Sequence, residues 1–289
     1  MDAVTQSAKK AGARWSVVVP YYNEANGFLA ATLRSLLAQT ARPLTLILVD
    51  NNSTDGSGEI ARAITEGIEG VEAIHLREPI PGQINALEAG ISLASTDFIA
   101  ICDADTIYPP HYLDQAAKLF DAGGEGLVGV MAMSVGADPS AFGALLKRYK
   151  GVIASHILRG QAHTGGYGHC FRLAALRASG GYGAQLWPYV LFDHELIHRV
   201  LKQGRIAYSP NLYCQSSNRR TDRAGVTWTL FERLLYHVTP FGLKDWFFYE
   251  FLARRFAARG MGQTALRQRN WEDGPNAAPV SAAAPAAGD

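Results

Sequence analysis

Two aspartates separated by one alanine, Asp103 and Asp105, carry the strongest chemical signal in the sequence. They come directly after the apolar run 98–102, so both carboxylates are expected where a buried strand ends. Carboxylates this close repel each other unless a cation lies between them, and oxygen ligands of this kind suit Mg²⁺ or Mn²⁺. The pair therefore indicates a divalent-metal site that could also hold a diphosphate, although Asp is also common in the turns that follow strands.

Short apolar runs alternate with helical periodicities in the first half of the chain. Runs at 15–20, 44–49, 72–76 and 98–102 predict strands, and the segments between them have apolar residues at helical spacing. Strands this apolar are buried on both faces, so we expect a mainly parallel sheet with helices on each side. Ligands bind such a sheet at the carboxyl ends of its strands, where the loops carrying Asp103 and Asp105 would converge with their neighbours.

The second half of the chain is less regular. Glycines cluster at Gly165, Gly166 and Gly168, which suggests close approach of the backbone to a ligand. Farther along, apolar residues at helical spacing predict a helix through Leu196 and Val200. We expect a polar extension at 1–14, a globular domain at 15–215 with a nucleotide half at 15–135 and a second half at 136–215, a basic and aromatic helical region at 216–272, and a disordered tail at 273–289.

Composition and charge exclude several classes of protein. The 27 Lys and Arg residues nearly balance the 26 Asp and Glu residues, so the net charge of +1 gives no field that would attract nucleic acid. The three cysteines lie far apart and indicate neither a disulfide framework nor a zinc site. Residues 1–14 lack the apolar core of a signal peptide, and no apolar run approaches the length of a membrane span, so we expect a cytoplasmic protein.

Three polar segments follow predicted strands in a fixed order. They are VVVPYYNE at 17–24, LVDNNSTDGS at 48–57 and CDAD at 102–105, the last preceded by Asn85 and Gly90. Together with the segment 166–200, they resemble the family 2 glycosyltransferases of the GT-A fold, over roughly residues 15–215. The resemblance implies an α/β fold of GT-A type, in which a mainly parallel central sheet is flanked by helices and a Rossmann-like nucleotide half adjoins an acceptor half. The region beyond it is expected to form a C-terminal helical appendage.

The resemblance also assigns residues to a nucleotide-sugar donor. Asp50 matches the acidic residue that pairs with the donor base, and the backbone from Pro20 to Asn23 would frame the base and ribose. Asp103 would face the ribose and the metal, and Asp105 would coordinate Mn²⁺ or Mg²⁺ beside the diphosphate. Asp50 could instead cap the next helix, but Asp55 is better placed for that cap. The candidate donor-binding residues in this half are Pro20, Tyr22, Glu24, Asp50, Asn85 and Asp103.

An acidic helix start in the second half supplies the candidate base. In the family, such a residue takes the proton from the acceptor hydroxyl, and the resemblance gives this role to Asp193, with Glu195 as the second choice. The family usually has Glu before this aspartate, whereas this chain has Phe192. The pattern alone also fits Asp193 as a helix N-cap and Glu195 as a first-turn charge. His169 in the glycine cluster fits an acceptor contact or, more simply, a hydrogen-bonded loop histidine.

A basic run offers candidates for binding the diphosphate. The family often has a basic residue shortly before its Asn-x-Gly, but the segment 81–86 of this chain has none. The diphosphate charge must then be met elsewhere, and Arg219 and Arg220 are the candidate donor-binding residues for it. The run 218–223 could form a loop that closes over the donor, or a solvated charged turn.

The segment 231–259 is rich in aromatic residues and arginine. One interpretation is an interfacial helix that lies on a membrane, which would suit a lipid-linked acceptor at the inner membrane face. The other is a helix that packs on the catalytic domain or on a second copy of the chain. The sequence does not separate them. The apolar side of this helix would consist of Trp246, Phe247, Phe248, Phe251, Leu252 and Phe256, with Arg254, Arg255 and Arg259 at the lipid headgroups.

The resemblance implies an inverting hexosyltransferase that moves a sugar from a nucleotide diphosphate, most commonly UDP, to an acceptor hydroxyl. The acceptor could be a lipid or a polysaccharide end in cell-envelope glycan synthesis, or a small metabolite. A sugar nucleotidyltransferase is the first alternative, but it would normally have a Gly-rich, Arg-containing loop after the first strand. A non-catalytic nucleotide-sugar-binding module is the second alternative, and it would have little reason to keep Asp193. We therefore predict a metal-dependent glycosyltransferase.

Overall fold

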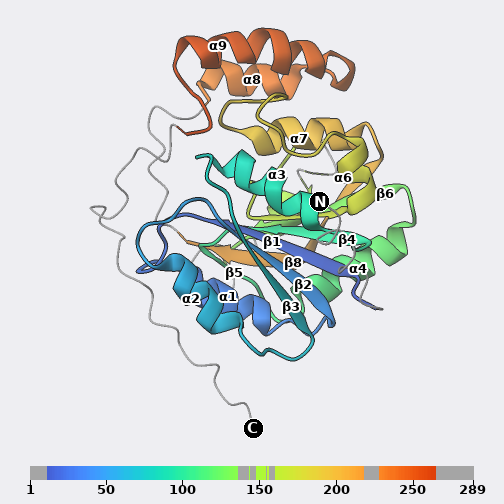
Figure 1. Ribbon diagram of the computed structural model, residues 1–289. Coiled ribbons are helices and arrows are strands. Elements are labelled where there is room, and N and C mark those ends of the chain that lie inside the picture. Colours follow the sequence, from blue (N-terminus) through green and yellow to red (C-terminus); the bar gives the residue numbers. More distant parts are fainter. Residues whose placement is uncertain are drawn as a thin grey trace.

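The computed structural model describes residues 12–135, 143, 148–153, 155, 160–217 and 228–264. Most of the predicted N-terminal extension and the whole predicted tail at 273–289 lie outside these residues. The described part is an α/β structure in which helices cover both faces of a central sheet (Figure 1). This arrangement confirms the fold class expected from the sequence.

The described strands form an eight-stranded mixed sheet in the order β3-β2-β1-β4-β7-β6-β8-β5. The first four run parallel to one another, as predicted. Strand β7 is antiparallel to both β4 and β6, and β6 and β8 are parallel, so the sheet is mixed on the far side of β4. The strands are β1 (Trp15–Tyr21), β2 (Leu44–Asp50), β3 (Val71–Arg77), β4 (Phe98–Cys102), β5 (Thr106–Ile107), β6 (Leu127–Ser134), β7 (Gly168–Arg172) and β8 (Arg205–Ser216).

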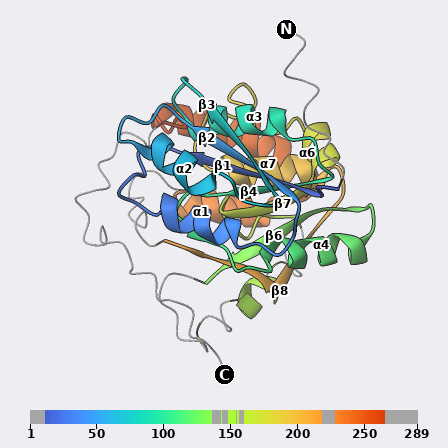
Figure 2. The same cartoon turned by 60° about the horizontal axis from the view of Figure 1, so that its bottom comes forward.

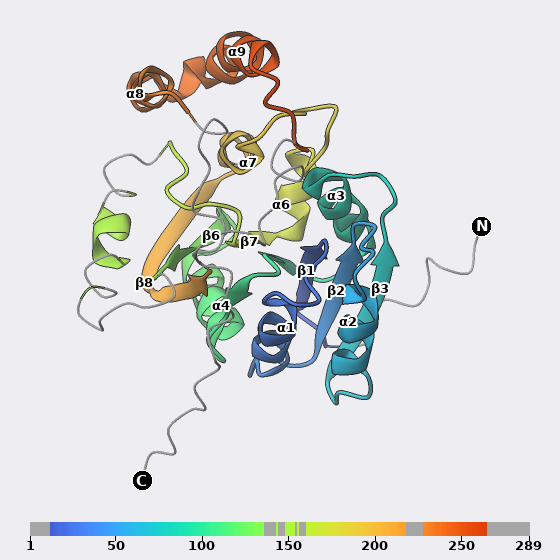
Figure 3. The ribbon, with the colours of Figure 1, turned by 90° about the vertical axis from the view of Figure 1, so that its left-hand side faces the viewer.

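Helices on the two faces of the sheet bury two apolar cores (Figures 2 and 3). Successive residues of a strand point to opposite faces, so Val17 and Val19 of β1 enter one core and Val18 enters the other. The first core lies under α1 (Leu29–Leu37), α2 (Ser57–Thr65) and α4 (Tyr112–Gly123), and the second under α3 (Gln83–Leu93), α6 (Leu173–Ala178) and α7 (Phe192–Leu201).

The C-terminal helices lie over α7 (Figures 1 and 3). They are α8 (Leu230–Val238), a 3₁₀ turn η1 (Phe241–Leu243), a π-helical segment η2 (Trp246–Leu252) and α9 (Ala253–Ala258). Phe247, Phe248, Leu252 and Phe256 are buried in a third core that also contains Trp187 and Trp228. The proposed contact of these four side chains with lipid is therefore wrong, and packing on the domain is the correct alternative for them. Among the described helices, none has the length and apolar character needed to cross a membrane.

Two exposed arginines of that predicted lipid-facing helix form ion pairs with α8. The carboxylate of Glu232 on α8 is fully buried, and it forms ion pairs with Arg255 and Arg259 at 2.7 Å each. Glu232 also closes a capping box at the start of α8 with Thr229. These ion pairs hold α8 against α9, and contact of the exposed sides of the two arginines with lipid headgroups stays a prediction.

Candidate active site

The loops that follow β1 and β2 are joined by hydrogen bonds. The backbone N–H of Asn23 donates to the Ser53 hydroxyl at 3.1 Å, and the N–H of Thr54 donates to the Asn23 side chain at 2.9 Å. The buried Glu24 donates its own N–H to the hydroxyl of Ser57 at 2.8 Å. These contacts hold together the polar segments that follow the two strands. The two segments therefore form one connected surface at the carboxyl ends of the strands, where ligands bind such sheets.

Asp50 ends β2 beside a small cavity of about 140 Å³. Its Oδ1 accepts the N–H of Ser53 at 2.7 Å, and the cavity is also lined by Tyr21. Burial, together with the charge of Asp50, raises the pKa of Tyr21, so the phenol stays neutral. At the start of α2, it is Asp55 that accepts the N–H of Ser57, at 3.0 Å. Asp50 is thus left facing the cavity, and the helix-cap alternative is not observed.

Asp103 and Asp105 lie between β4 and β5, and residues distant along the chain contact both of them. Gln83, at the start of α3, donates its side-chain N–H to Asp103 Oδ1 at 3.2 Å. The Ser217 hydroxyl, just beyond β8, donates to Asp105 Oδ2 at 3.0 Å. Strand β5 follows Asp105 directly and pairs with the end of β8, so this strand pair holds Asp105 beside Ser217. Gln83 was missed by the sequence analysis, which considered only basic side chains in its segment.

The carboxylates of Asp103 and Asp105 are suited to bind a cation whose other ligands are phosphate oxygens of a substrate. Within the described residues, no group of three or more His, Cys, Asp and Glu side chains is arranged to enclose a metal ion. Mg²⁺ is commonly held by one or two carboxylates together with water and substrate phosphate oxygens, so a complete protein cage is not required. The donor chemistry of Asp103 and Asp105 is therefore suited to Mn²⁺ or Mg²⁺ bound jointly with a diphosphate.

Asp193 lies in the first turn of α7 and faces the glycine cluster. Its Oδ2 accepts the backbone N–H of Gly166 at 2.9 Å. A methyl group added at Gly165 or Gly166 would lie 3.6 to 3.7 Å from the carboxylate, so the loop backbone packs against it. The N-cap of α7 is Leu191, and no side chain caps the helix. The N-cap interpretation of Asp193 is therefore wrong, because its carboxylate bonds to another segment instead of to its own helix.

Two buried histidines near Asp193 are held neutral. Burial lowers the pKa of His169 on β7, and the charge of Asp193 opposes this effect only in part. Burial also lowers the pKa of His194 to about 4. The His194 ring packs edge-on against Trp228 and Tyr236, with ring centres 5.2 and 5.6 Å apart, so it anchors α7 to the C-terminal region. Neither imidazole adds a positive charge beside the carboxylate at neutral pH.

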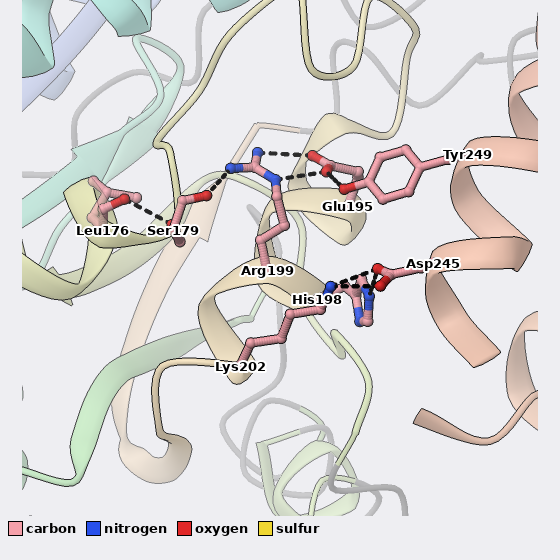
Figure 4. Close-up of polar contacts among 8 residues, drawn as sticks. All are labelled: Leu176, Ser179, Glu195, His198, Arg199, Lys202, Asp245 and Tyr249. Carbon is pink, nitrogen blue, oxygen red and sulfur yellow. Dashed lines mark hydrogen bonds and ion pairs between the residues drawn. The ribbon is translucent and has the colours of Figure 1, made fainter. Parts of the chain in front are cut away.

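Glu195 occupies a different environment from Asp193 (Figure 4). Its carboxylate is 1% exposed and accepts hydrogen bonds from Arg199 Nε at 2.6 Å and Nη2 at 2.9 Å. The hydroxyl of Tyr249 donates to the same carboxylate, and Arg199 also donates to the carbonyl of Ser179. These contacts tie α7 to the C-terminal helices. They favour a structural role for Glu195 and leave Asp193 as the stronger candidate base.

The other candidate donor-binding residues have varied surroundings. Pro20 is buried within β1, Tyr22 is half-buried in the following loop, and Glu24 is buried beside Ser57. Asn85 donates its side-chain N–H to the carbonyl of Pro81 at 3.0 Å, which stabilises the turn before α3. Arg219 and Arg220 lie outside the described residues. Donor contact by all of these side chains remains a prediction.

A short chain of hydrogen bonds joins the two acidic sites. The N–H of Asp103 donates to the Tyr108 hydroxyl at 2.9 Å, and this hydroxyl donates to the carbonyl of Tyr167 at 2.6 Å. The preceding residue, Gly166, is the one whose N–H binds Asp193. Burial raises the pKa of Tyr108, so the phenol stays protonated and can donate. This link could not be read from the sequence, because Tyr108 and Tyr167 are 59 residues apart.

Comparison with protein families and curated proteins gives a consistent result. The sequence model described as Glycosyl transferase family 2 matches residues 16–177. The undecaprenyl-phosphate 4-deoxy-4-formamido-L-arabinose transferase of Serratia proteamaculans is 33% identical over 110 residues, covering 37% of this chain and 34% of that protein. The matched part of the chain spans about a third of the length of such curated relatives.

Solved structures share the fold at low sequence identity. The mannosyltransferase PcManGT from Pyrobaculum calidifontis, in complex with GDP-Man and Mn²⁺, has a TM-score of 0.58 and 21% identity, covering 82% of this chain and 65% of that chain. TarS 1–349 of S. aureus, in complex with UDP-GlcNAc, has a TM-score of 0.56 and 18% identity, covering 90% of this chain and 77% of that chain. These likenesses confirm the GT-A type fold expected from the sequence.

Proposed function

Since the chain belongs to glycosyl transferase family 2, we propose that it is an inverting hexosyltransferase that moves a sugar from a UDP-sugar to an acceptor hydroxyl. Use of a nucleotide sugar follows from the family, and the curated relatives include enzymes of cell-envelope glycan synthesis. The proposal goes further in naming UDP, inversion, and Asp193 as the base.

The connection between the two acidic sites is the observation that carries the proposal. Asp103 and Asp193 are linked through the Tyr108 hydroxyl and the adjacent residues Gly166 and Tyr167. A transferase needs one group that binds the departing diphosphate and a second group that takes a proton from the acceptor. Two acidic sites joined by so few hydrogen bonds meet this need, whereas a binding module has no use for the second.

In the proposed reaction, the Asp193 carboxylate accepts the proton of the acceptor hydroxyl as its oxygen forms a bond to the anomeric carbon. The bond from that carbon to the diphosphate oxygen breaks on the opposite side, so the configuration inverts. Mn²⁺ or Mg²⁺, held by Asp103 and Asp105, would stabilise the negative charge that develops on the leaving diphosphate. The N–H of Gly166 orients the Asp193 carboxylate before the acceptor arrives.

A lipid-linked acceptor at the inner face of the membrane completes the proposal. A relative whose name specifies undecaprenyl phosphate supports an acceptor of this class. UDP is the first choice of carrier because TarS was solved with UDP-GlcNAc, and the GDP-Man complex of PcManGT makes GDP the second. Donor binding by Asp50, and diphosphate binding by Arg219 and Arg220, are parts of the same proposal.

The proposal is tested by separating donor binding from transfer. We expect UDP or a UDP-sugar to raise the melting temperature in the presence of Mn²⁺, because a ligand that binds only the folded state stabilises it. Asp193→Asn should keep this shift and lose about 10²- to 10⁴-fold in transfer rate. Glu66→Gln, an exposed carboxylate at the end of α2, is the matched control and should change neither measurement.

Two outcomes would contradict the proposal in different ways. Equal loss of donor binding and transfer in Asp193→Asn would remove Asp193 from the role of base. Absence of a shift with every nucleotide and nucleotide sugar, with or without Mn²⁺, would contradict the transferase proposal itself.

A further inference from the structure

An apolar surface lies on α8 and the turn after it, on the side away from the domain core. Leu230 is 74% exposed, Phe231 59%, Leu234 55% and Val238 72%. Single exposed apolar residues are common, but a contiguous group of large ones marks a surface that meets another molecule. We call this group, together with the exposed side chains that follow in the chain, the α8 surface: Leu230, Phe231, Leu234, Val238, Phe241, Leu243 and Trp246.

The helical geometry of α8 separates this surface from the face that packs on the domain. At about 100° of rotation per residue, Leu230, Phe231, Leu234 and Val238 fall within an arc of about 100°. The opposite side carries Glu232, Tyr236 and the half-buried Leu235, which face the third core. Since the inward face of α8 is already packed, the exposed apolar arc is an additional feature of the helix.

An exposed arginine borders the α8 surface. Arg233 and His237 lie along one edge of the apolar arc, and burial lowers the pKa of His237, so Arg233 carries the positive charge there. The acidic side chains of the described C-terminal helices are paired with basic ones: Glu232 with two arginines, Asp245 with Lys202 at 2.6 Å, and Glu250 with Arg254 at 2.6 Å. The edge of the surface is thus basic, which complements an anionic partner.

We propose that the α8 surface inserts shallowly into a lipid bilayer that contains anionic headgroups. Exposed apolar side chains that include Phe231 and Trp246, with Arg233 beside them, match the composition of helices that lie in the membrane interface. A symmetric contact between two copies would bring the same surface together with itself, and its basic edge against an equally basic edge. Anionic lipid attracts that edge instead.

The position of α8 connects this surface with the proposed acceptor side of the site, a step that rests on the proposed function. The Tyr236 hydroxyl accepts the N–H of Ala162 at 3.0 Å, and Gln161 Nε2 donates to the carbonyl of His237 at 3.0 Å. The same loop continues to Gly166, which binds Asp193. A bilayer under α8 would therefore lie on the side of the domain where a lipid-linked hydroxyl must approach the base.

The test is sedimentation of the full chain with vesicles of phosphatidylcholine, with and without phosphatidylglycerol. We expect wild-type protein to sediment with the anionic vesicles. The triple variant F231S/L234S/V238S should lose at least about tenfold in vesicle affinity, since three inserted apolar side chains are removed. Arg233→Glu should lose about fivefold or more on anionic vesicles and little on neutral ones. Ile80→Ser with Ile153→Ser, two exposed apolar residues elsewhere, is the matched control.

The variants change exposed side chains, so their melting temperatures should equal that of the wild type, and this is checked first. Equal vesicle binding by the wild type and the triple variant, or no binding by the wild type, would overturn the proposal. So would a wild-type dimer in sedimentation velocity that the triple variant converts to a monomer, because the surface would then join two copies. Vesicle binding needs no donor, so the result is independent of the nucleotide-induced stabilisation that tests the proposed function.

Discussion

Replacement of Glu195 by glutamine separates a structural carboxylate from a catalytic one. Glu195 is 1% exposed and its partner Arg199 is 11% exposed, so this ion pair is shielded from water. Glutamine keeps the size of the side chain but removes its charge, which leaves the Arg199 guanidinium buried without a counter-charge (Figure 4). The substitution also places an amide near Tyr249, whose hydroxyl donates to the carboxylate in the wild type.

The expected cost follows from this burial. Breaking a buried ion pair by removing one partner typically costs about 3–5 kcal/mol, because the remaining charge is uncompensated. Arg199 keeps its hydrogen bond to the Ser179 carbonyl, so we expect the lower end, about 3 kcal/mol. This loss lowers the folding equilibrium constant about a hundredfold. A domain with a typical stability of about 5–15 kcal/mol would still be folded at room temperature.

The assay is urea denaturation of Glu195→Gln, followed by measurement of transfer per folded molecule. We expect the unfolding midpoint to fall while transfer changes little, the reverse of the result expected for Asp193→Asn. Tyr249→Phe is the matched control: it keeps the ion pair and removes one hydrogen bond to the carboxylate, so about 1.5 kcal/mol should be lost. Unchanged stability of Glu195→Gln with a hundredfold loss of transfer would refute the reasoning and make Glu195 the base.

Three further predictions address the metal, a buried lysine and a helix contact. Asp105→Asn should abolish the Mn²⁺-dependent part of the UDP-induced rise in melting temperature, and an unchanged metal dependence would remove Asp105 from the metal site. Burial lowers the pKa of Lys244 from 10.5 to about 8, so the unfolded chain binds more protons between these values. The unfolding free energy of the wild type should therefore rise relative to that of Lys244→Met as the pH is raised above about 8, and a pH-independent difference would contradict this. In Gly90→Ala, the new methyl group would lie 2.6 Å from Val18 and 2.9 Å from Val49, so a loss of about 1–3 kcal/mol in urea denaturation should outweigh the gain in helix propensity. A more stable Gly90→Ala would show that α3 can shift away from the sheet.

The first half of the fold could be predicted because its strands are apolar on both faces. Runs such as 15–20 and 44–49 have few alternatives to a buried parallel strand, and β1 and β2 begin where these runs begin. The strand β8 gave no comparable signal, since it contains Pro210 and is only partly buried. Its register against β6 shifts between Tyr208 and Tyr213, which places the proline in an irregular stretch. A proline in a strand is tolerated at such irregularities, but in the sequence it argues against a strand.

The residues of the candidate site were predictable where acidic side chains directly follow a strand. Asp50 and Asp103 follow strands directly, so the sequence places them at the edge of the sheet where ligands bind. Two contacts that distinguish Asp193 from Glu195, those with Gly166 and Tyr249, were not predictable, because both partners are distant from α7 in the chain. The interpretation of Asp193 as an N-cap is wrong for a related reason, because its carboxylate accepts the N–H of Gly166, which lies in another segment.

The C-terminal region shows why periodicity alone misassigned an apolar face. The aromatic stretch predicts one regular helix, but Trp246–Leu252 is π-helical, and its wider turn changes which side chains share a face. As a result, Phe247 and Phe248 are buried whereas Trp246 is 49% exposed. The exposed apolar arc lies instead on α8, where leucine and phenylalanine at helical spacing are equally typical of a core.

Helix α7 carries the proposed base on one side and contacts the C-terminal region with another side. At about 100° per residue, His194, Glu195, His198 and Lys202 share one side of the helix, and all four contact the C-terminal helices or the segment before them. Leu196, Ile197 and Val200 occupy the opposite side and enter the core against the sheet. Asp193 lies on that sheet-facing side, where it meets Gly166. Because a single short helix makes both sets of contacts, the position of Asp193 depends on the packing of α7 against the sheet and on its packing against the C-terminal helices.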